Sequence, residues 1–517
     1  MRLIVLLSLL ATVSPPSCCE RRNTTVCANE AGFECDEGQL CQVPAGQTFG
    51  ACVQAECGVG QATCPGDRPL CVAGRCKACE QDADCQVQSA ETPVCIDGAC
   101  VACRDNSQCK TSDRKVCDAT SHTCRGCKLH SECSPGVCAK DDAFATLSSP
   151  IPPGSCVDAS RVAEVADTCD VSCLQTVLSS GVNTAKPYVR ILRYSASGRL
   201  TIPALPPGLP RFYIIGPLAD VRATQIATAP AMGLSSASGP AVEVLGGSHV
   251  TLEGVIIRDS VTGLDCNSKS TLSTGTPTKV SLIRSLLGGN QVAIKASTQC
   301  ELDVDQTWIG KGPTAVFASI SRNDTSMVLD STRLRMVNSV LWDNGKSTPQ
   351  FGGIQLSDTA NRRPAVHIVN STFARLEWSA MGQMTLAIDC DYDPAGSLAV
   401  VNTLFLNDVL PGGYTYVRGL CRGTAGSLTS VGSNDAALVG VGNTTNLVSD
   451  NTFTDAANGD LRVRTTAASG VTNGGVSSLT DGKGLDVIVP SVDFDGKPRG
   501  STGSPTARTL GAFEVSR

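Results

Sequence analysis

The sequence has little aromatic content, little charge and very few histidines. Aromatic residues make up 4% of its 517 residues, charged residues make up 17%, and histidine occurs 4 times. The net charge of −6 indicates no basic surface, which argues against nucleic acid and an anionic membrane surface as partners. Beyond the N-terminus, no apolar stretch is long enough for a transmembrane span. Glycine, in contrast, is abundant (50 residues), as is typical of turn-rich β proteins.

Familiar catalytic motifs are also missing. The sequence contains no G-x-S-x-G, no H-E-x-x-H, no P-loop and no dinucleotide-binding fingerprint. These absences weaken the case for an enzyme, although a lyase needs few catalytic residues.

The N-terminus predicts export. One Arg precedes an apolar run over residues 3–13, which is followed by small residues and prolines, so we expect residues 1–17 to be a signal peptide. Cys18 directly after it also suggests a bacterial lipoprotein site, although the neighbouring prolines fit that motif poorly. The expected location is therefore outside the cell or on its surface, with a lipid anchor in the outer membrane as an alternative.

Cysteine is concentrated in the first third of the chain. Of 28 cysteines, most lie between Cys18 and Cys138, and C-x2-C-x5-C begins at Cys76, Cys100 and Cys124. A unit this short buries too little apolar surface to fold alone, so we expect two disulfides per unit. Four cysteines allow three pairings, and the sequence does not choose among them. Export favours disulfides over zinc.

A proline-rich joint, "SSPIPPGSC", marks a change of composition at Cys156. Cysteine becomes sparse after it and β-branched residues become frequent. We therefore expect a disulfide-rich region over residues 18–156 and a separate β domain over residues 157–517.

The β domain contains an internal repeat. "MVNSVLW", "IVNSTFA" and "VVNTLFL" place Asn338, Asn370 and Asn402 at equal intervals, and apolar residues alternate with polar ones just before each asparagine. Alternation with a period of two predicts a short strand with one buried face. A regular repeat of such strands predicts a parallel β-helix whose coils stack at about 4.8 Å.

The asparagines occupy the predicted bend between two strands of each coil. Asn adopts the left-handed conformation more readily than most residues. Stacking of the coils would bring successive side-chain amides within bonding distance, so Asn338, Asn370 and Asn402 are expected to form a ladder of amide–amide hydrogen bonds.

The β domain resembles the right-handed β-helix, or pectin-lyase-like, superfamily. Its two ends resemble bacterial surface proteins of the choice-of-anchor type: "DTCDVSCLQTVLSSG" is similar to their N-terminal capping helix, and "DFDGKPRG" with "LGAFE" to their C-terminal ending. The resemblance implies an all-β chain, in which a right-handed parallel β-helix, a single-stranded solenoid with a cap at each end, follows a small disulfide-rich repeat region.

One set of candidate site residues lies on successive coils. Asp303, Arg335 and His367 occupy the same outward position of their strands. An acid, a cation and an imidazole in line suit the binding or cleavage of an acidic sugar. The alternative is an exposed electrostatic ladder that slightly stabilises stacking. The paired aspartates, Gly-His-Gly and Arg-x-Lys motifs of polygalacturonase-like enzymes are absent.

A second candidate is the stretch "IDCDYD", with Asp389, Asp391 and Asp393. Alternating carboxylates in an extended segment supply oxygen ligands suited to Ca²⁺. The alternative is a solvated turn. No other cofactor is expected.

Four cysteines of the β domain have a spacing close to one coil. Cys390 and Cys421, and likewise Cys266 and Cys300, are therefore predicted to form disulfides between stacked coils. The alternative is four buried free thiols.

The sequence as a whole favours a structural or adhesive protein that binds a polysaccharide or a cell-surface glycan. The alternative is a carbohydrate-active enzyme, either a polysaccharide lyase or a glycosidase.

Overall fold

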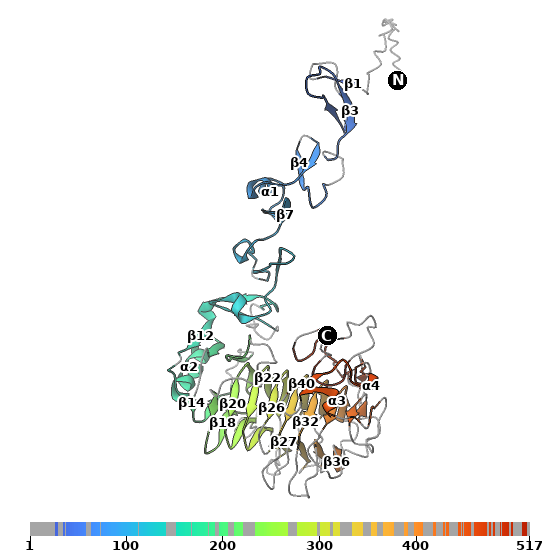
Figure 1. Ribbon diagram of the computed structural model, residues 1–517. Coiled ribbons are helices and arrows are strands. Elements are labelled where there is room, and N and C mark those ends of the chain that lie inside the picture. Colours follow the sequence, from blue (N-terminus) through green and yellow to red (C-terminus); the bar gives the residue numbers. More distant parts are fainter. Residues whose placement is uncertain are drawn as a thin grey trace, which may run out of the picture. The chain divides into compact units, whose positions relative to one another are not determined.

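The computed structural model forms two compact units, residues 1–125 and 126–517 (Figure 1). It describes residues 26–513 apart from the following: 29–34, 37, 58–63, 73, 112, 141–150, 167, 185, 192–195, 205–210, 221–232, 267–276, 297–299, 311–313, 321–332, 345–352, 359–364, 377–386, 391–397, 407–416, 420–427, 430, 434–442, 446, 448, 456–459, 473–474, 477–478, 481–485, 488, 496–497 and 500–508. No helix in this described part is long and apolar enough to cross a membrane.

Five disulfide modules follow one another, and in each the first cysteine pairs with the third and the second with the fourth. Modules 1 to 5 cover residues 27–52, 57–76, 79–100, 103–124 and 127–156. The first four lie in the smaller unit, with elements β1 (Val26–Cys27), β2 (Gln39–Gln42), β3 (Gly50–Gln54), β4 (Leu70–Val72), β5 (Arg75–Lys77), α1 (Asp82–Gln88), β6 (Val94–Ile96), β7 (Ala99–Val101), η1 (Asn106–Gln108), β8 (Val116–Asp118) and β9 (Thr123–Arg125).

The modules divide the cysteine repeat differently from the C-x2-C pattern. Cys76 pairs with Cys64, whereas Cys79 pairs with Cys95, so the two cysteines of one C-x2-C belong to successive modules. The motif therefore joins two modules across two residues. Its thiols are used in disulfides, in agreement with the preference for disulfides over zinc.

Each of modules 3 to 5 closes its short helical turn with a capping box. Asp84, Gln108 and Glu132 accept hydrogen bonds from the two backbone N–H groups that precede each turn. Local bonds and disulfides thus hold modules with little apolar core.

Module 5 belongs to the larger unit. Its elements are η2 (His130–Cys133), β10 (Val137–Cys138) and β11 (Cys156–Val157), followed by η4 (Ala159–Arg161). The unit boundary falls between Arg125 and Gly126 rather than at Cys156, because module 5 packs on the β domain.

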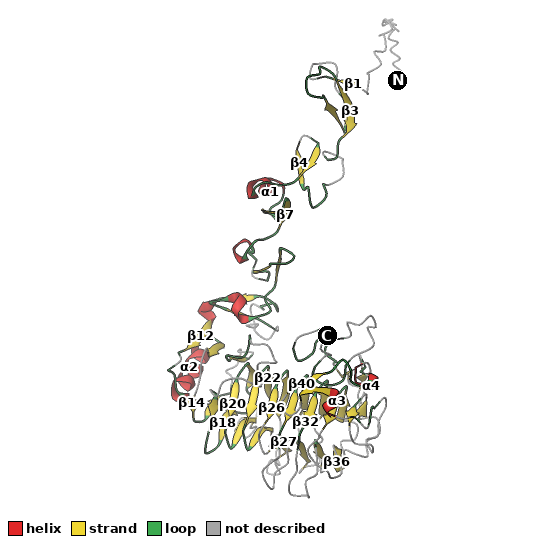
Figure 2. Cartoon of the chain, in the orientation of Figure 1, coloured by secondary structure: helices red, strands yellow, loops and turns green. Residues whose placement is uncertain are grey.

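The β domain is a right-handed parallel β-helix built from three parallel sheets (Figure 2). Sheet 1 contains β12 (Val162–Val165), β13 (Tyr188–Ile191), β16 (Phe212–Ile215), β19 (His249–Glu253), β22 (Thr278–Ile283), β25 (Cys300–Asp305), β28 (Arg333–Val337), β31 (Ala365–Val369), β34 (Leu398–Val401) and β37 (Leu428–Thr429). Sheet 2 contains β14 (Ala196–Ser197), β17 (Leu234–Ser235), β20 (Ile256–Arg258), β23 (Leu286–Gly288), β26 (Trp308–Gly310), β29 (Val340–Trp342), β32 (Thr372–Ala374), β35 (Leu404–Leu406) and β38 (Gly432–Ser433).

Sheet 3 completes each coil. It contains β15 (Leu200–Ile202), β18 (Pro240–Val244), β21 (Thr262–Cys266), β24 (Val292–Ala296), β27 (Thr314–Ile320), β30 (Ile354–Asp358), β33 (Ile388–Cys390) and β36 (Val417–Gly419). The remaining elements are α2 (Val171–Thr184), α3 (Ser449–Thr452), β39 (Phe453–Asp455), β40 (Asp460–Val463), α4 (Ser469–Thr472), β41 (Leu479–Thr480) and β42 (Asp486–Val487).

In the described strands of the three parallel sheets, inward-pointing residues form a continuous apolar core. In sheet 1 the two inward columns are buried, as the alternation predicts, and include Val250, Leu252, Val280, Leu282, Leu302, Val304, Leu334, Met336, Val366, Ile368, Leu398 and Val400. Phe373 and Phe405 stack inside the coil with ring centroids 4.9 Å apart. Helix α2 covers this core near its N-terminal strands, with Leu174 and Leu178 fully buried in it.

The three asparagines adopt the predicted left-handed conformation, with φ of 46° at Asn338, 48° at Asn370 and 50° at Asn402. Their amides do not form the expected ladder in the described structure. Asn338 donates to Val492 O at 3.0 Å, and Asn402 donates to and accepts from Val476 at 2.8 Å. The side-chain amide of Asn370 has no hydrogen-bond partner among the described residues.

Hydroxyl groups form the stacked hydrogen bonds instead. Ser285, Thr307, Ser339, Ser371 and Thr403 follow the bend residues, and each hydroxyl donates to the carbonyl two residues earlier at 2.8–3.0 Å. From Thr307 onward, each hydroxyl oxygen also accepts the N–H of the equivalent residue in the preceding coil at 3.3–3.5 Å. A hydroxyl both donates and accepts, which lets it serve its own coil and the next one.

The C-terminal segment covers a side of the stack rather than its end. Arg499 donates to the carbonyls of Thr509, Gly511 and Ala512 and to the side chain of Asn338. Sheet 2 has an apolar outer face that includes Trp308, Trp342 and Leu404, and Phe494, Leu510 and Phe513 pack against it. The segment expected to be a C-terminal cap therefore runs back along several coils.

Candidate functional site

The outer face of sheet 1 carries three columns of side chains across successive coils. The second column contains Tyr213, Thr251, Ser281, Asp303, Arg335, His367 and Ala399 in register. The first contains His249, Lys279, Glu301 and Arg333, and the third contains Ile215, Glu253, Ile283, Asp305, Val337 and Val369.

The outer face is covered at both ends and open in the middle. Along the third column Glu253 and Val337 are buried, whereas Ile283 and Asp305 between them are partly exposed. Module 5 packs on the N-terminal end of this face, where Tyr188, Tyr213 and Ile215 share an apolar cluster with Val137 and Val157. At the other end, Val476 and Val489 pack on an apolar cluster that contains Val337, Val369, Ala399 and Val401.

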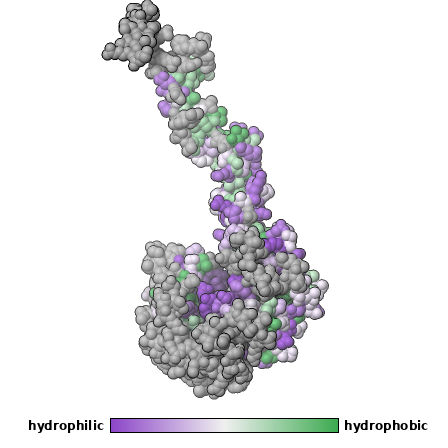
Figure 3. Space-filling view, turned by 180° about the vertical axis from the view of Figure 1, so that it is seen from behind, coloured by the Kyte–Doolittle hydropathy of each residue, from purple (hydrophilic) through white to green (hydrophobic). Residues whose placement is uncertain are grey.

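The open part of this face is called the charged window below. It consists of Lys279, Ser281 and Ile283 on β22, Glu301, Asp303 and Asp305 on β25, and Arg333 and Arg335 on β28. The acidic strand thus lies between two strands that carry cations. Figure 3, which views the chain from the side opposite to Figure 1, shows hydrophilic residues gathered in a hollow of the larger unit.

Two ion pairs cross the window. Lys279 Nζ lies 3.2 Å from Glu301 Oε2, and Arg333 Nη2 lies 3.1 Å from Asp303 Oδ2. Both cations are more than two-fifths exposed, at 45% and 44%. Pairs this exposed contribute little to stability, so a ligand can replace them at small cost.

Asp305 differs from the other two acids of its strand. Its Oδ1 atom is buried and has no hydrogen-bond partner among the described residues. Burial raises the pKa of Asp305 to about 6, and the neighbouring charge of Asp303 raises it further, against the opposing effects of the charges of Arg335 and Arg284 and of the backbone N–H of Gln306. The cause lies in its neighbours on the third column, Ile283 and Val337, which are apolar.

The structure places the three predicted site residues in line, and they do not act as one exposed set. Asp303, Arg335 and His367 lie directly beside one another on β25, β28 and β31. His367, however, is 8% exposed and lies at the covered end of the face. The ion-pair partner of Asp303 is Arg333 rather than Arg335.

The proposed calcium ligands fall largely outside the described residues. Only the backbone of Asp389 is described, in β33, and Asp391 and Asp393 are not. Calcium binding there stays a prediction.

Of the two disulfides predicted between coils, the structure contains Cys266–Cys300, with a Cα–Cα distance of 6.1 Å. Cys421 lies outside the described residues, so its pairing with Cys390 stays a prediction. Cys390 is in register with Gly419, two residues before Cys421.

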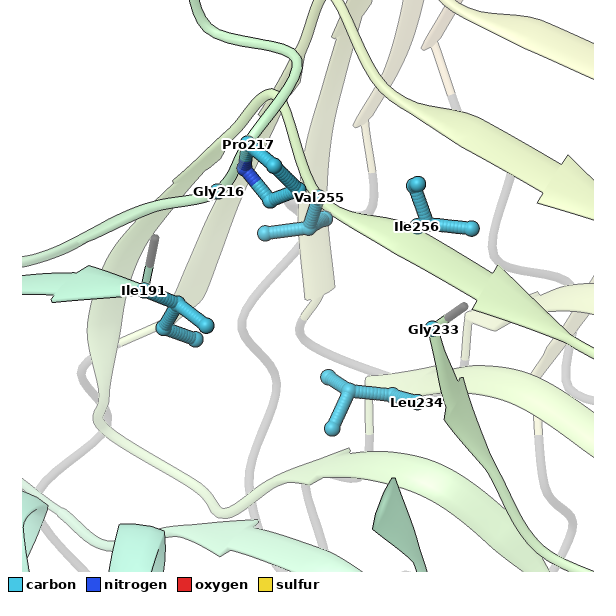
Figure 4. Close-up of a pocket in the computed structure, with 7 residues that line it drawn as sticks. All are labelled: Ile191, Gly216, Pro217, Gly233, Leu234, Val255 and Ile256. Atoms are coloured by element: carbon cyan, nitrogen blue, oxygen red, sulfur yellow. The ribbon is translucent and has the colours of Figure 1, made fainter. Parts of the chain in front are cut away.

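A small cavity between β13, β17 and β20 is not a ligand site (Figure 4). Its volume is about 10 Å³ and it is lined by Ile191, Gly216, Pro217, Gly233, Leu234, Val255 and Ile256. A space of this size holds about one water molecule at most, and its apolar side chains offer that water no partner.

Comparison with protein-family models, with curated proteins and with solved structures finds no match to this chain.

Sequence reasoning missed Asp305 and found its neighbour Asp303. The alternation that marked Asp303 as outward-facing also marks Asp305, two residues later on the same strand. Its raised pKa depends on Ile283 and Val337, its neighbours on adjacent coils, which lie far from it in the sequence, so the shift had no local signal.

Proposed function

We propose that this protein is an exported structural or adhesive protein that binds an extended carbohydrate across the charged window. The observation that supports this most strongly is the interruption of the two covers. Module 5 packs on the outer face of sheet 1 on one side of the window and Val476 and Val489 pack on it on the other side, whereas three adjacent coils between them carry exposed charges. A flat, repeating face suits a polymer that lies along the stack.

The contacts in such a complex would be polar. The window contains no aromatic side chain, so binding rests on hydrogen bonds and on charge. Asp305 is partly exposed within the window, so its carboxyl group is suited to accept a hydrogen bond from a sugar hydroxyl.

Export and surface attachment are part of this proposal. They are supported by the disulfides, which persist in oxidising environments, and by the N-terminal apolar run. The likeness to surface proteins of the choice-of-anchor type is supported by the C-terminal motif, in which Arg499 holds the ending against the stack.

A binding experiment with the full oxidised chain tests the ligand site. Asp305→Asn should weaken binding to whichever polysaccharide of a panel the wild type retains, by about tenfold or more, since a hydrogen bond to a charged group contributes roughly 1.5–3 kcal/mol. Glu243→Gln, on the outer face of sheet 3 beside Arg199, is the matched control and should bind as the wild type does. Binding should also weaken as salt is added.

The same variant should gain stability. The folded pKa of about 6 lies above the ordinary value of 3.8, so the stability that Asp305 contributes is present below pH 3.8 and is lost as the pH rises through 6. At pH 8 the free energy of unfolding of Asp305→Asn, measured by denaturant titration, should therefore exceed that of the wild type by on the order of 1–3 kcal/mol. A variant that is more stable and binds less marks a functional residue. Unchanged binding by Asp305→Asn, or no bound polysaccharide at all, would refute the site.

A second candidate function, glycoside hydrolysis, is supported by the two aspartates of β25. Asp303 and Asp305 face the same side two residues apart, which corresponds to about 6.6 Å along a strand. Inverting glycosidases use two carboxyl groups roughly 6.5–9.5 Å apart, one of which carries a proton near neutral pH. Release of reducing ends that both Asp303→Asn and Asp305→Asn abolish would favour this function over binding alone.

A further inference from the structure

The third residue after the first cysteine has the same internal role in three modules. Asp82 in module 3 accepts the N–H of Cys95 at 2.9 Å, and Asn106 in module 4 accepts that of Cys117 at 2.8 Å. In module 5 the residue is His130, whose Nδ1 accepts the N–H of Cys138 at 3.2 Å. Each acceptor thus binds the third cysteine of its own module.

In modules 3 and 5 the same side chain also contacts the part of the chain that follows. The carboxylate of Asp82 accepts hydrogen bonds from Arg104 of module 4, at 3.1 and 3.4 Å. In module 5, His130 Nε2 lies 3.1 Å from Glu253 Oε2, on β19 of the β-helix. The position that contacts the next module in module 3 therefore contacts the β-helix domain, called the body below, in module 5.

The backbone contact decides which ring nitrogen of His130 donates to Glu253. Because Nδ1 accepts the N–H of Cys138, Nε2 is the ring nitrogen that donates to Glu253. Lys140 also forms an ion pair with Glu253.

Glu253 is completely buried beneath module 5. It accepts hydrogen bonds from His130, from Lys140 and from the hydroxyl of Tyr213. Asp220 of the same body accepts the N–H groups of His130 and Ser131 at 2.7 Å each.

Backbone groups of module 5 complete the contact. Arg190 on β13 donates to the carbonyl oxygens of Pro135 and Gly136, and β10 pairs with β11 just before the chain enters the first coil. Charged and polar groups of the β-helix thus pair with module 5 at several points, so deletion of one partner would leave its buried counterpart unpaired.

We propose that module 5, called the mount below, docks on the outer face of sheet 1 as part of the larger unit, and that the contact between His130 and Glu253 holds it there. Modules 1 to 4 and the body would then fold as separate units, while module 5 depends on both its own disulfides and the face of sheet 1. This role is independent of the ligand proposed for the charged window.

Amide hydrogen exchange on the full oxidised chain tests the mount. His130→Asn places in module 5 the residue that module 4 already uses, so it keeps an acceptor for Cys138 N–H and loses the reach to Glu253. The amides of Ser131, Ala139 and Val157 should exchange at least tenfold faster, whereas those of Cys117 in module 4 and Asn370 in the body should be unchanged. Glu253→Gln should have the same effect.

Asn106→Ala is the matched control, because it removes the equivalent acceptor from module 4. It should speed the exchange of Cys117 and leave Ala139 and Val157 as they are. The proposal would be overturned by wild-type exchange in module 5 of either His130→Asn or Glu253→Gln. Equal acceleration at Asn370 would also overturn it, because module 5 would then be an inseparable part of the β-helix core.

Discussion

Different interactions stabilise the two units of this chain. In modules 3 and 4 each segment of about twenty residues is closed by two disulfides and a capping box, with partners no more than 16 residues apart. In the β-helix, partners such as Asn338 N–H and Val369 O lie a whole coil apart, and a continuous apolar core fills the stack. Short cross-links replace a core where the segment is too small to have one.

Each unit is therefore sensitive to a different change. A module of the smaller unit depends on the redox state of its surroundings more than on its neighbours. A coil depends on the coils above and below it, and the described coils contain few disulfides.

Reduction should separate the units most sharply. Dithiothreitol should unfold modules 1 to 4, because loss of one native disulfide from a small domain costs about 2–5 kcal/mol and each module has two. The β-helix should keep its strand signal in circular dichroism. Limited proteolysis then yields a resistant fragment from the C-terminal two-thirds of the chain, and equally fast digestion of both units would contradict this.

Loss of a stacked ring should be the most damaging single change in the β-helix. Phe373 is fully buried against Phe405, so Phe373→Ala should lower the free energy of unfolding of this unit by about 3–5 kcal/mol. Val87→Ala, at an 88% exposed position of module 3, is the control and should change nothing measurable. Urea titration followed by Trp fluorescence checks both, and a shift of less than about 1 kcal/mol in Phe373→Ala would count against the stacked core.

Acid should act on the mount before it acts on the coils. Burial alone would raise the pKa of Glu253, but the hydrogen bond from His130 and the charge of Lys140 lower it to about 2 from 4.5. The stability that Glu253 contributes is therefore complete above pH 4.5 and is lost as the pH falls through 2. The protection factor of Ala139 N–H, which is the intrinsic exchange rate divided by the observed rate at the same pH, should fall over that interval in the wild type. A protection factor that stays constant down to pH 2 would show that the carboxylate is not needed.

The smallest expected effects on stability come from substitutions of the two kinds of polar residue at the bend, the hydroxyl residues and the asparagines. Ser339→Ala should cost about 1–3 kcal/mol, since it leaves the buried N–H of Thr307 without its acceptor. Asn370→Gly should cost less than about 1 kcal/mol, because glycine keeps the left-handed φ and the amide of Asn370 has no partner among the described residues. A reversed order in thermal denaturation would restore the asparagine ladder.

Local patterns of the sequence were sufficient for the strands and for the turn. The alternation around Val280, Leu302 and Leu334 predicted which residues face inward, because a strand directs successive side chains to opposite faces regardless of what covers them. The left-handed bend at Asn338, Asn370 and Asn402 was likewise predictable, since it follows from the backbone preference of one residue type. Because the short strands repeat at regular intervals, stacking of the repeats predicted the β-helix.

Only the tertiary structure decided which outward-facing residues are exposed. His367 and Asp303 occupy the same column and had equal standing in the sequence, yet His367 is buried at the covered end and Asp303 lies in the open window. His130 lies in a cysteine repeat, and its buried partner Glu253 is 123 positions later in the sequence. Burial and pKa depend on segments brought together across such distances, so a short stretch of sequence does not predict them.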